Sequence, residues 1–182
     1  MQTPPRATRP NVGRALPVVF VVAVALTGAS RAAAAPTHPF GVTLEAGAPD
    51  LVGLRLTVRP RGWLRLNVGP VTDLFSAGVS GGVTVVPLRT LVSPSLTIDG
   101  GYLFDGDTHG IPRALGLPFD GRASYGFVDG HLGLEVGANR RACFFLHAGV
   151  SYLDLTAHGG SFEAAHLKVW GPSAKLGLTV YL

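Results

Sequence analysis

Apolar residues alternate with polar or small residues along most of the chain after residue 38, and this period of two is the feature that most limits its fold. Successive side chains of a β-strand point to opposite faces, so the alternation predicts strands with one apolar face each. It occurs in eight segments, at residues 40–47, 52–59, 63–69, 77–85, 95–104, 131–137, 144–152 and 174–182. We therefore expect an all-β fold of about eight strands.

The links between these segments alternate in length. Three links are short, at residues 60–62, 86–89 and 138–141, whereas residues 105–123 and 155–166 form two long ones. Short turns on one rim and long loops on the other are typical of an up-and-down antiparallel transmembrane β-barrel, with the short turns in the periplasm. The sequence thus predicts two long surface loops on the opposite rim.

The strand faces agree across two expected hairpins. Glu45 and Arg55 fall on one polar face, close enough to pair across the first hairpin, and Val136 is expected opposite Phe144 across the turn near residue 139. A slip of one residue would send every side chain to the other face, so this agreement supports the strand assignment.

Two orientations fit the alternation, because the apolar face points inward in a soluble barrel and outward to lipid in a membrane barrel. Only two lysines occur, which suits a wall with little contact with water. The polar face is rich in glycine, which leaves space for long side chains in the narrow lumen of an eight-stranded barrel. These glycines are Gly41, Gly47, Gly53, Gly69, Gly78, Gly82, Gly133, Gly137, Gly149 and Gly177. The membrane orientation is therefore favoured.

Aromatic residues gather near the segment ends, as in the two interfacial girdles of membrane proteins. Phe40, Trp63, Phe144 and Tyr181 are expected near the short turns, and Phe75, Tyr102, Phe104, Tyr125, Phe127, Tyr152 and Trp170 near the long loops.

Residues 1–34 have the pattern of a cleaved Sec signal peptide: Arg6, Arg9 and Arg14 precede an apolar stretch at 15–29, and small residues follow it. An uncleaved anchor is the alternative, but the stretch is shorter than the roughly 18–20 residues of a spanning helix. Cleavage before Ala35 leaves residues 35–182 as one exported domain. Four of the 15 basic residues are then lost, so 11 bases face 11 acids and no nucleic-acid partner is expected.

Charged residues on the polar face would point into the lumen of a membrane barrel. They are Glu45, Arg55, Arg59, Arg65, Asp99, Glu135 and Lys175. Opposite charges that are buried together need partners, so a salt-bridged plug is favoured over the alternative of a polar, ion-selective pore lining.

No catalytic or metal-binding constellation is recognisable. His131 and His147 are expected side by side in the lumen, without the spacing of metal ligands. Ser151 follows His147 by four residues on one strand, about 13 Å, which is too far for a hydrogen-bonded nucleophile and base. Cys143 is the lone cysteine. We expect neither an enzyme nor a protein with a cofactor or bound metal.

The last eight residues resemble the C-terminal assembly signal of outer-membrane barrels, with Lys175, Gly177, Val180 and Leu182 at its key places and Leu182 where an aromatic residue is usual. Over residues 38–182 the chain resembles the small eight-stranded outer-membrane barrels of the OmpA/OmpX/OmpW-like group. This resemblance implies outer-membrane lipid and the barrel-assembly machinery as partners, and location in the outer membrane of a Gram-negative bacterium.

The sequence therefore predicts an integral outer-membrane barrel with a packed or very narrow polar lumen and a structural or surface-interaction role. A narrow pore for small solutes is one alternative, and a soluble periplasmic barrel around an apolar ligand cavity is another. No motif identifies a ligand for the surface loops.

Overall fold

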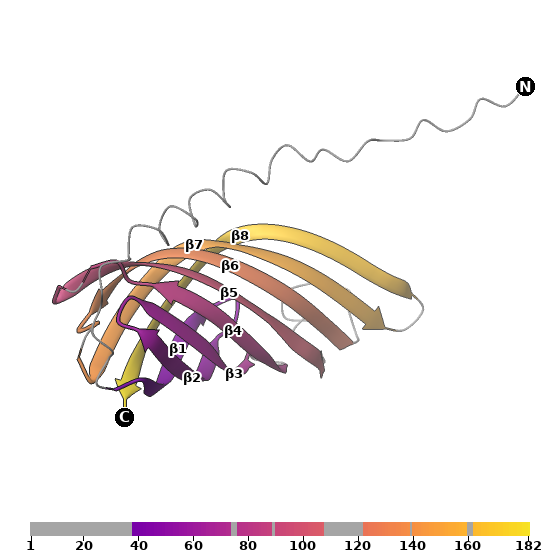
Figure 1. Ribbon diagram of the computed structural model, residues 1–182. Coiled ribbons are helices and arrows are strands. Elements are labelled where there is room, and N and C mark those ends of the chain that lie inside the picture. The colour runs from indigo at the N-terminus through magenta and orange to yellow at the C-terminus, as the bar shows by residue number, and fades with distance from the viewer. Residues whose placement is uncertain (1–37, 74–75, 89, 108–121, 139, 160–161) are drawn as a thin grey trace, which may run out of the picture. The chain divides into compact units, whose positions relative to one another are not determined.

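The computed structural model describes residues 38–73, 76–88, 90–107, 122–138, 140–159 and 162–182. They form eight strands: β1 (Phe40–Ala48), β2 (Val52–Arg61), β3 (Leu64–Thr72), β4 (Ala77–Val85), β5 (Val92–Asp107), β6 (Arg122–Val136), β7 (Ala142–Gly159) and β8 (Phe162–Tyr181). Each strand pairs antiparallel with the next, and β8 pairs with β1, which closes the barrel (Figure 1). The predicted fold class, an all-β up-and-down barrel of eight strands, is confirmed.

The register follows the parity expected from the sequence. Val136 of β6 lies opposite Phe144 of β7. In the first hairpin Arg55 lies opposite Thr43, and Glu45 lies opposite Gly53, so Glu45 and Arg55 are diagonal neighbours on the same face. Diagonal neighbours remain within reach of long side chains. No helix of the described residues is long and apolar enough to cross a membrane.

The barrel has a short wall and a tall wall. Strands β1 to β4, the short wall, have nine or ten residues each, whereas β5 to β8, the tall wall, have 15 to 20. In Figure 1, β7 and β8 extend well past the strands of the short wall. We use "short-turn rim" for the end that holds the β2–β3, β4–β5 and β6–β7 links, and "tall rim" for the other end.

One of the two predicted long loops is wrong. The β7–β8 ladder continues through the segment 155–166 as far as the pair Gly159 and Phe162. Leu153 and Leu155 face Val169 and Leu167 there, so cross-strand apolar pairs extend the hairpin to its glycine-rich tip. The other predicted loop is shortened, because β5 runs to Asp107 and β6 begins at Arg122; residues 108–121 lie outside the described part.

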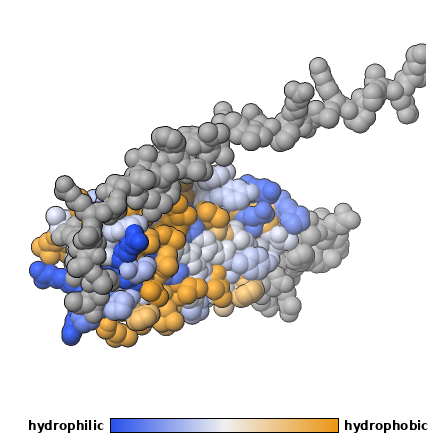
Figure 2. Space-filling view, viewed as in Figure 1, coloured by the Kyte–Doolittle hydropathy of each residue, from blue (hydrophilic) through white to orange (hydrophobic). Residues whose placement is uncertain are grey.

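The aliphatic face points outward on both walls. Figure 2 shows hydrophobic residues as a band over the face in view, with hydrophilic residues toward both ends. Exposed members of this belt include Leu44, Leu54, Leu56 and Val68 on the short wall, and Leu132, Leu134, Leu146, Val150, Leu176 and Leu178 on the tall wall. The opposite face of the same strands is buried and mostly polar where all eight strands pair.

The aromatic girdles are partly wrong. Phe40 and Phe144 near the short turns are exposed, as are Tyr102, Phe104 and Trp170 on the tall wall, and Tyr152 is half-buried. Trp63, Tyr181 and Phe127 are instead buried, and Tyr125 is half-buried against the cluster that contains Phe127. Tyr125, Phe127 and Tyr181 occupy positions that alternate onto the inner face of their strands, and Trp63 follows a turn. Proximity to a segment end therefore does not decide whether an aromatic side chain points inward or outward. Phe75 lies outside the described residues.

Candidate functional site

The lumen holds all seven charged residues that the sequence placed on the inner face. Glu45, Arg55, Arg59, Arg65, Asp99, Glu135 and Lys175 are each at most 7% exposed. They come from β1, β2, β3, β5, β6 and β8, so closure of the barrel brings together residues far apart in sequence. The lumen is therefore the candidate functional site, because it brings these charged side chains together.

Glycines make room for these large side chains. Gly53 lies opposite Glu45, and Gly82 lies opposite Asp99. A Cβ atom at Gly82 would collide with the carboxylate of Asp99, and one at Gly133 would collide with the ring of His147. At these positions glycine, which has no side chain, leaves space for a long side chain from the neighbouring strand. An eight-stranded barrel needs such space because its lumen is narrow.

Arg55 is the centre of the larger ion-pair cluster. Its guanidinium contacts Glu45, lies 3.1 Å from Asp50 and 2.8 Å from Asp99, and donates a hydrogen bond to Asn67 at 2.8 Å. Three carboxylates from β1, the β1–β2 turn and β5 thus share one cation. Because these groups are nearly all excluded from water, their attraction is only weakly screened.

Lys175 completes this cluster from β8. Its ammonium lies 2.9 Å from Asp50, 3.0 Å from Asp129 and 3.8 Å from Asp99. Four carboxylates (Glu45, Asp50, Asp99 and Asp129) therefore surround two cations, an excess of acid that the sequence did not reveal. We call these six residues the central cluster.

Sequence reasoning missed Asp50 and Asp129. Asp50 lies in the β1–β2 turn, where an aspartate is an ordinary turn former, yet its side chain is buried. Asp129 lies two residues before the segment expected to form the sixth strand. It has the parity of His131, so extending the alternation would have found it. It also accepts a 2.5 Å hydrogen bond from Ser151.

A second cluster lies nearer the short-turn rim. Arg65 contacts Glu135 and donates a hydrogen bond to the carbonyl oxygen of Ala138 at 3.0 Å. Arg59 also donates to that carbonyl at 3.0 Å, and its guanidinium lies 4.2 Å from the centre of the Tyr181 ring. A carboxylate, a carbonyl oxygen and an aromatic face thus hold the two arginines at this end of the lumen.

Five hydrogen-bonded threonines lie between the two clusters. Thr43 shares hydrogen bonds with Thr57 at 2.6 Å and with Thr179 at 2.7 Å, and Thr84 pairs with Thr97 at 2.9 Å. These five residues line a cavity of about 30 Å³ together with side chains of both clusters. A cavity of this size and polarity has room for about two water molecules.

Apolar side chains are buried near both ends of the lumen. Val71, Leu103 and Phe127 form a buried cluster toward the tall rim, with Tyr125 and Leu153 packed against it. At the short-turn rim Val86, Ala138, Cys143 and Tyr181 form another. An apolar cluster therefore lies on each side of the charged interior.

The two lumen histidines do not bond to each other. The rings of His131 and His147 stack with centres 6.3 Å apart, but each shares a hydrogen bond with a serine. His131 pairs with Ser173 at 2.9 Å and His147 with Ser95 at 3.1 Å. Among the described residues, no group of His, Cys, Asp or Glu is arranged to hold a metal ion.

The residues of the C-terminal assembly signal divide between the two faces of β8. Lys175 and Gly177 point into the lumen, where Gly177 leaves space for the ring of Phe145, while Val180 and the final Leu182 are exposed. Comparison with family models, with curated proteins and with solved structures gave no match. Inferences about function therefore come from the geometry of this barrel.

Proposed function

We propose that this chain is an integral outer-membrane β-barrel whose lumen is closed by its own charged side chains. The observation that carries the proposal is the distribution of polarity, with a belt of exposed aliphatic residues outside and the central cluster inside. Exposed apolar patches of monomeric soluble proteins rarely exceed a few hundred Å². A lipid environment removes the cost of such a belt, and closure leaves no strand edge within the region where all eight strands pair.

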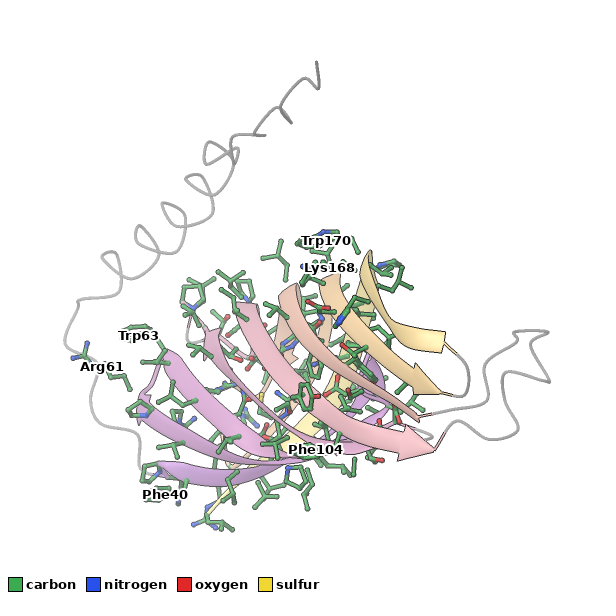
Figure 3. All side chains as sticks on the ribbon, turned by 90° about the vertical axis from the view of Figure 1, so that its right-hand side faces the viewer. Phe40, Arg61, Trp63, Phe104, Lys168 and Trp170 are labelled. Carbon is green, nitrogen blue, oxygen red and sulfur yellow. The ribbon has the colours of Figure 1, made fainter. Side chains whose placement is uncertain are left out.

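The exposed aromatic residues support a bilayer boundary at each end of the belt. Phe40 and Phe144 lie toward the short-turn rim, and Phe104 and Trp170 toward the tall rim. Figure 3 shows Phe40, Arg61 and Trp63 at one end of the barrel, away from Lys168 and Trp170. Aromatic rings of this kind favour the interface between lipid and water.

A soluble barrel that binds an apolar ligand needs the reverse arrangement. Its aliphatic residues would line an internal cavity, whereas here the internal cavity is lined by threonines and charged groups. The polarity of the two faces thus favours the membrane proposal over this alternative.

The packing of the lumen favours a plug over a narrow pore. Ion pairs cross the lumen from both walls, and the cavity between the clusters holds about two water molecules. We therefore assign this barrel a structural or surface-interaction role, with the part of the tall wall beyond the short wall as its contact region outside the membrane. Residues 1–34 would direct export, and Lys175, Gly177, Val180 and Leu182 would be read by the barrel-assembly machinery before the lumen closes.

Membrane fractionation combined with gel electrophoresis tests the proposal. The protein should fractionate with outer membranes and migrate differently in SDS before and after boiling, because a folded barrel resists the detergent until heated. Recovery in the soluble periplasmic fraction would refute the membrane location. Planar-bilayer recording of the folded protein tests the plug, since steady single-channel currents would support the pore.

A further inference from the structure

The acidic residues outside the lumen fall on one side of the barrel only. After residue 38 the chain has 11 acids and 11 bases, of which five acids and four bases face the lumen. In sequence, the other six acids, at positions 73, 105, 107, 120, 154 and 163, and three bases, at positions 113, 122 and 168, fall in or beside the links on the tall-rim side. The remaining four bases, at positions 61, 89, 140 and 141, fall in or beside the short links, whose sequences contain no acidic residue.

Three of these arginines are described and exposed. Arg61 ends β2, with its guanidinium 5.9 Å from the centre of the Trp63 ring, and Arg140 and Arg141 precede β7. None of the three forms an ion pair with a carboxylate of the described residues; the Nε atom of Arg141 donates to His38 at 3.2 Å.

Exposed apolar side chains share the short-turn rim with the arginines. Phe40, Phe144 and Leu182 are exposed on the same rim, and Leu88 and Leu91 flank the β4–β5 link there. His38 joins the sector, because its Nδ1 atom lies 3.2 Å from the Leu182 oxygen while its Nε2 atom accepts from Arg141. A rim that only had to stay soluble would mix charges of both signs instead of joining arginine to exposed Phe and Leu.

This combination matches the chemistry of a phospholipid headgroup. Guanidinium groups bind phosphate oxygens in a planar, two-pronged geometry, and the long arginine stem lies along apolar surface while its head reaches the polar layer. Exposed phenylalanine and leucine beside them would lie at the level of the acyl chains. The tall rim also has exposed aromatic residues, but on that side the acids outnumber the bases by six to three in sequence.

We propose that the short-turn rim binds the phosphate groups of anionic glycerophospholipids through Arg61, Arg140 and Arg141. This inference rests on the proposed membrane insertion. It further specifies which class of lipid the rim binds and which leaflet the rim faces. The rim would prefer the leaflet that carries these lipids, and the opposite charge of the tall rim would disfavour the inverted orientation.

Competition between two lipids with identical acyl chains tests the proposal. The folded protein is placed in bilayer discs of phosphatidylcholine containing about a third phosphatidylglycerol, and the lipids that stay bound are counted by native mass spectrometry. Phosphatidylglycerol should be enriched over its share of the bilayer, by up to roughly fivefold for each arginine. In the triple variant R61Q/R140Q/R141Q the bound ratio should fall to that of the bilayer.

The matched control is Lys168→Gln, which removes an exposed cation from the tall wall and should leave the enrichment unchanged. Arg140→Gln alone guards against loss of folding, because the Arg140 side chain makes no hydrogen bond or ion pair to the described residues; it should lower the enrichment partially. Inorganic phosphate should not abolish the enrichment, since it lacks the acyl chains.

An unchanged lipid ratio in the triple variant, or an equal loss in Lys168→Gln, overturns the rim proposal while leaving membrane insertion intact. Loss of the enrichment to inorganic phosphate would show that the arginines bind phosphate without a lipid, which also overturns it. Failure of the wild-type protein to enter the discs at all, with no heat-sensitive band, refutes the membrane proposal itself, and the rim proposal with it.

Discussion

The short wall and the tall wall begin alike at the short-turn rim and differ toward the other end. On the short wall the strands stop at turns, and the side chain of Asp50 from one of these turns enters the lumen. The tall wall continues, and its polarity inverts: outward positions become Asp154, Thr156 and Lys168, and inward positions become Leu153 and Leu155. The change occurs just past the pair Tyr152 and Trp170.

The comparison shows that the outward face of a single strand can be apolar over one part of its length and polar over another. Parity is continuous along β7, yet the outward face is aliphatic at Leu146 and Val150 and polar from Asp154 onward. If the aliphatic belt meets lipid, the polar continuation meets water, so the end of the belt marks the bilayer surface on the tall wall. Four expected outcomes test this comparison, from the largest effect to the smallest.

The largest effect concerns the ion pairs that join the two walls. Arg55→Met should lower the free energy of unfolding by about 3–5 kcal/mol, because it leaves a buried excess of carboxylates with only Lys175. Glu45→Gln should cost only about 1 kcal/mol, since Arg55 keeps Asp50 and Asp99. The sequence alone predicts equal costs for both changes, because it does not reveal the excess of acid.

Folding titrations in lipid vesicles measure both variants, with Glu45→Leu and Arg55→Met combined as the double variant. The double change should cost less than Arg55→Met alone, because it removes one of the stranded carboxylates. In a hydrated pore each single change would cost about 0–1 kcal/mol. Small additive effects together with altered single-channel currents would therefore establish the pore.

The next effect concerns the outer faces. Leu134→Arg on the tall wall and Leu56→Arg on the short wall should each cost about 2–4 kcal/mol at the middle of the bilayer. Thr156→Arg, on the outer face of β7 beyond Tyr152, should cost only about 0–1 kcal/mol. Thr57→Ser in the lumen is the matched control and should change little, because the hydroxyl that pairs with Thr43 remains. Equal costs at positions 134 and 156 would contradict the boundary drawn at Trp170.

A smaller effect concerns a hydrogen bond between the walls. The Tyr125 hydroxyl on β6 donates to a carboxylate oxygen of Asp73 after β3, at 2.8 Å. Tyr125→Phe keeps the ring against the apolar cluster and should cost about 1–2 kcal/mol. Thermal or urea unfolding of the folded barrel measures it, and Tyr152→Phe on the outer face serves as the control. No difference between the two variants would mean that this bond does not link the walls.

The smallest effect on stability is expected from inserted tags that report topology. A protease-accessible tag at Gly116, between β5 and β6, should be cleaved from outside intact cells, and one at Asn139, in a short turn, should be protected. In sequence both positions fall between strands, because β5 ends at Asp107 and β6 begins at Arg122, and β6 ends at Val136 and β7 begins at Ala142; neither insertion should therefore disturb the ladder. Cleavage only at Asn139 would mean that the short-turn rim faces outward.

Much of the fold was predictable from local pattern. The alternation gave eight strands and their faces, and the pairing of Val136 with Phe144 is as expected. Strand ends were less predictable, because the cross-strand pairs of Leu155 with Leu167 and Leu153 with Val169 extend β7 and β8 through a segment that reads as a loop. The prediction of exposed girdles failed for aromatic residues, such as Phe127, whose place in the alternation puts them on the inner face.

The sequence by itself determined which side chains share a face, because that follows from the geometry of a single strand. Only the tertiary structure decided which charges meet. Arg55 bonds to Asp99, 44 positions away, and Lys175 bonds to Asp50 of a turn and Asp129 of β6. These partners depend on how the barrel closes and how its strands are staggered, which are properties of all eight strands together. The acid excess of the central cluster and the polarity inversion on the tall wall emerge at that level.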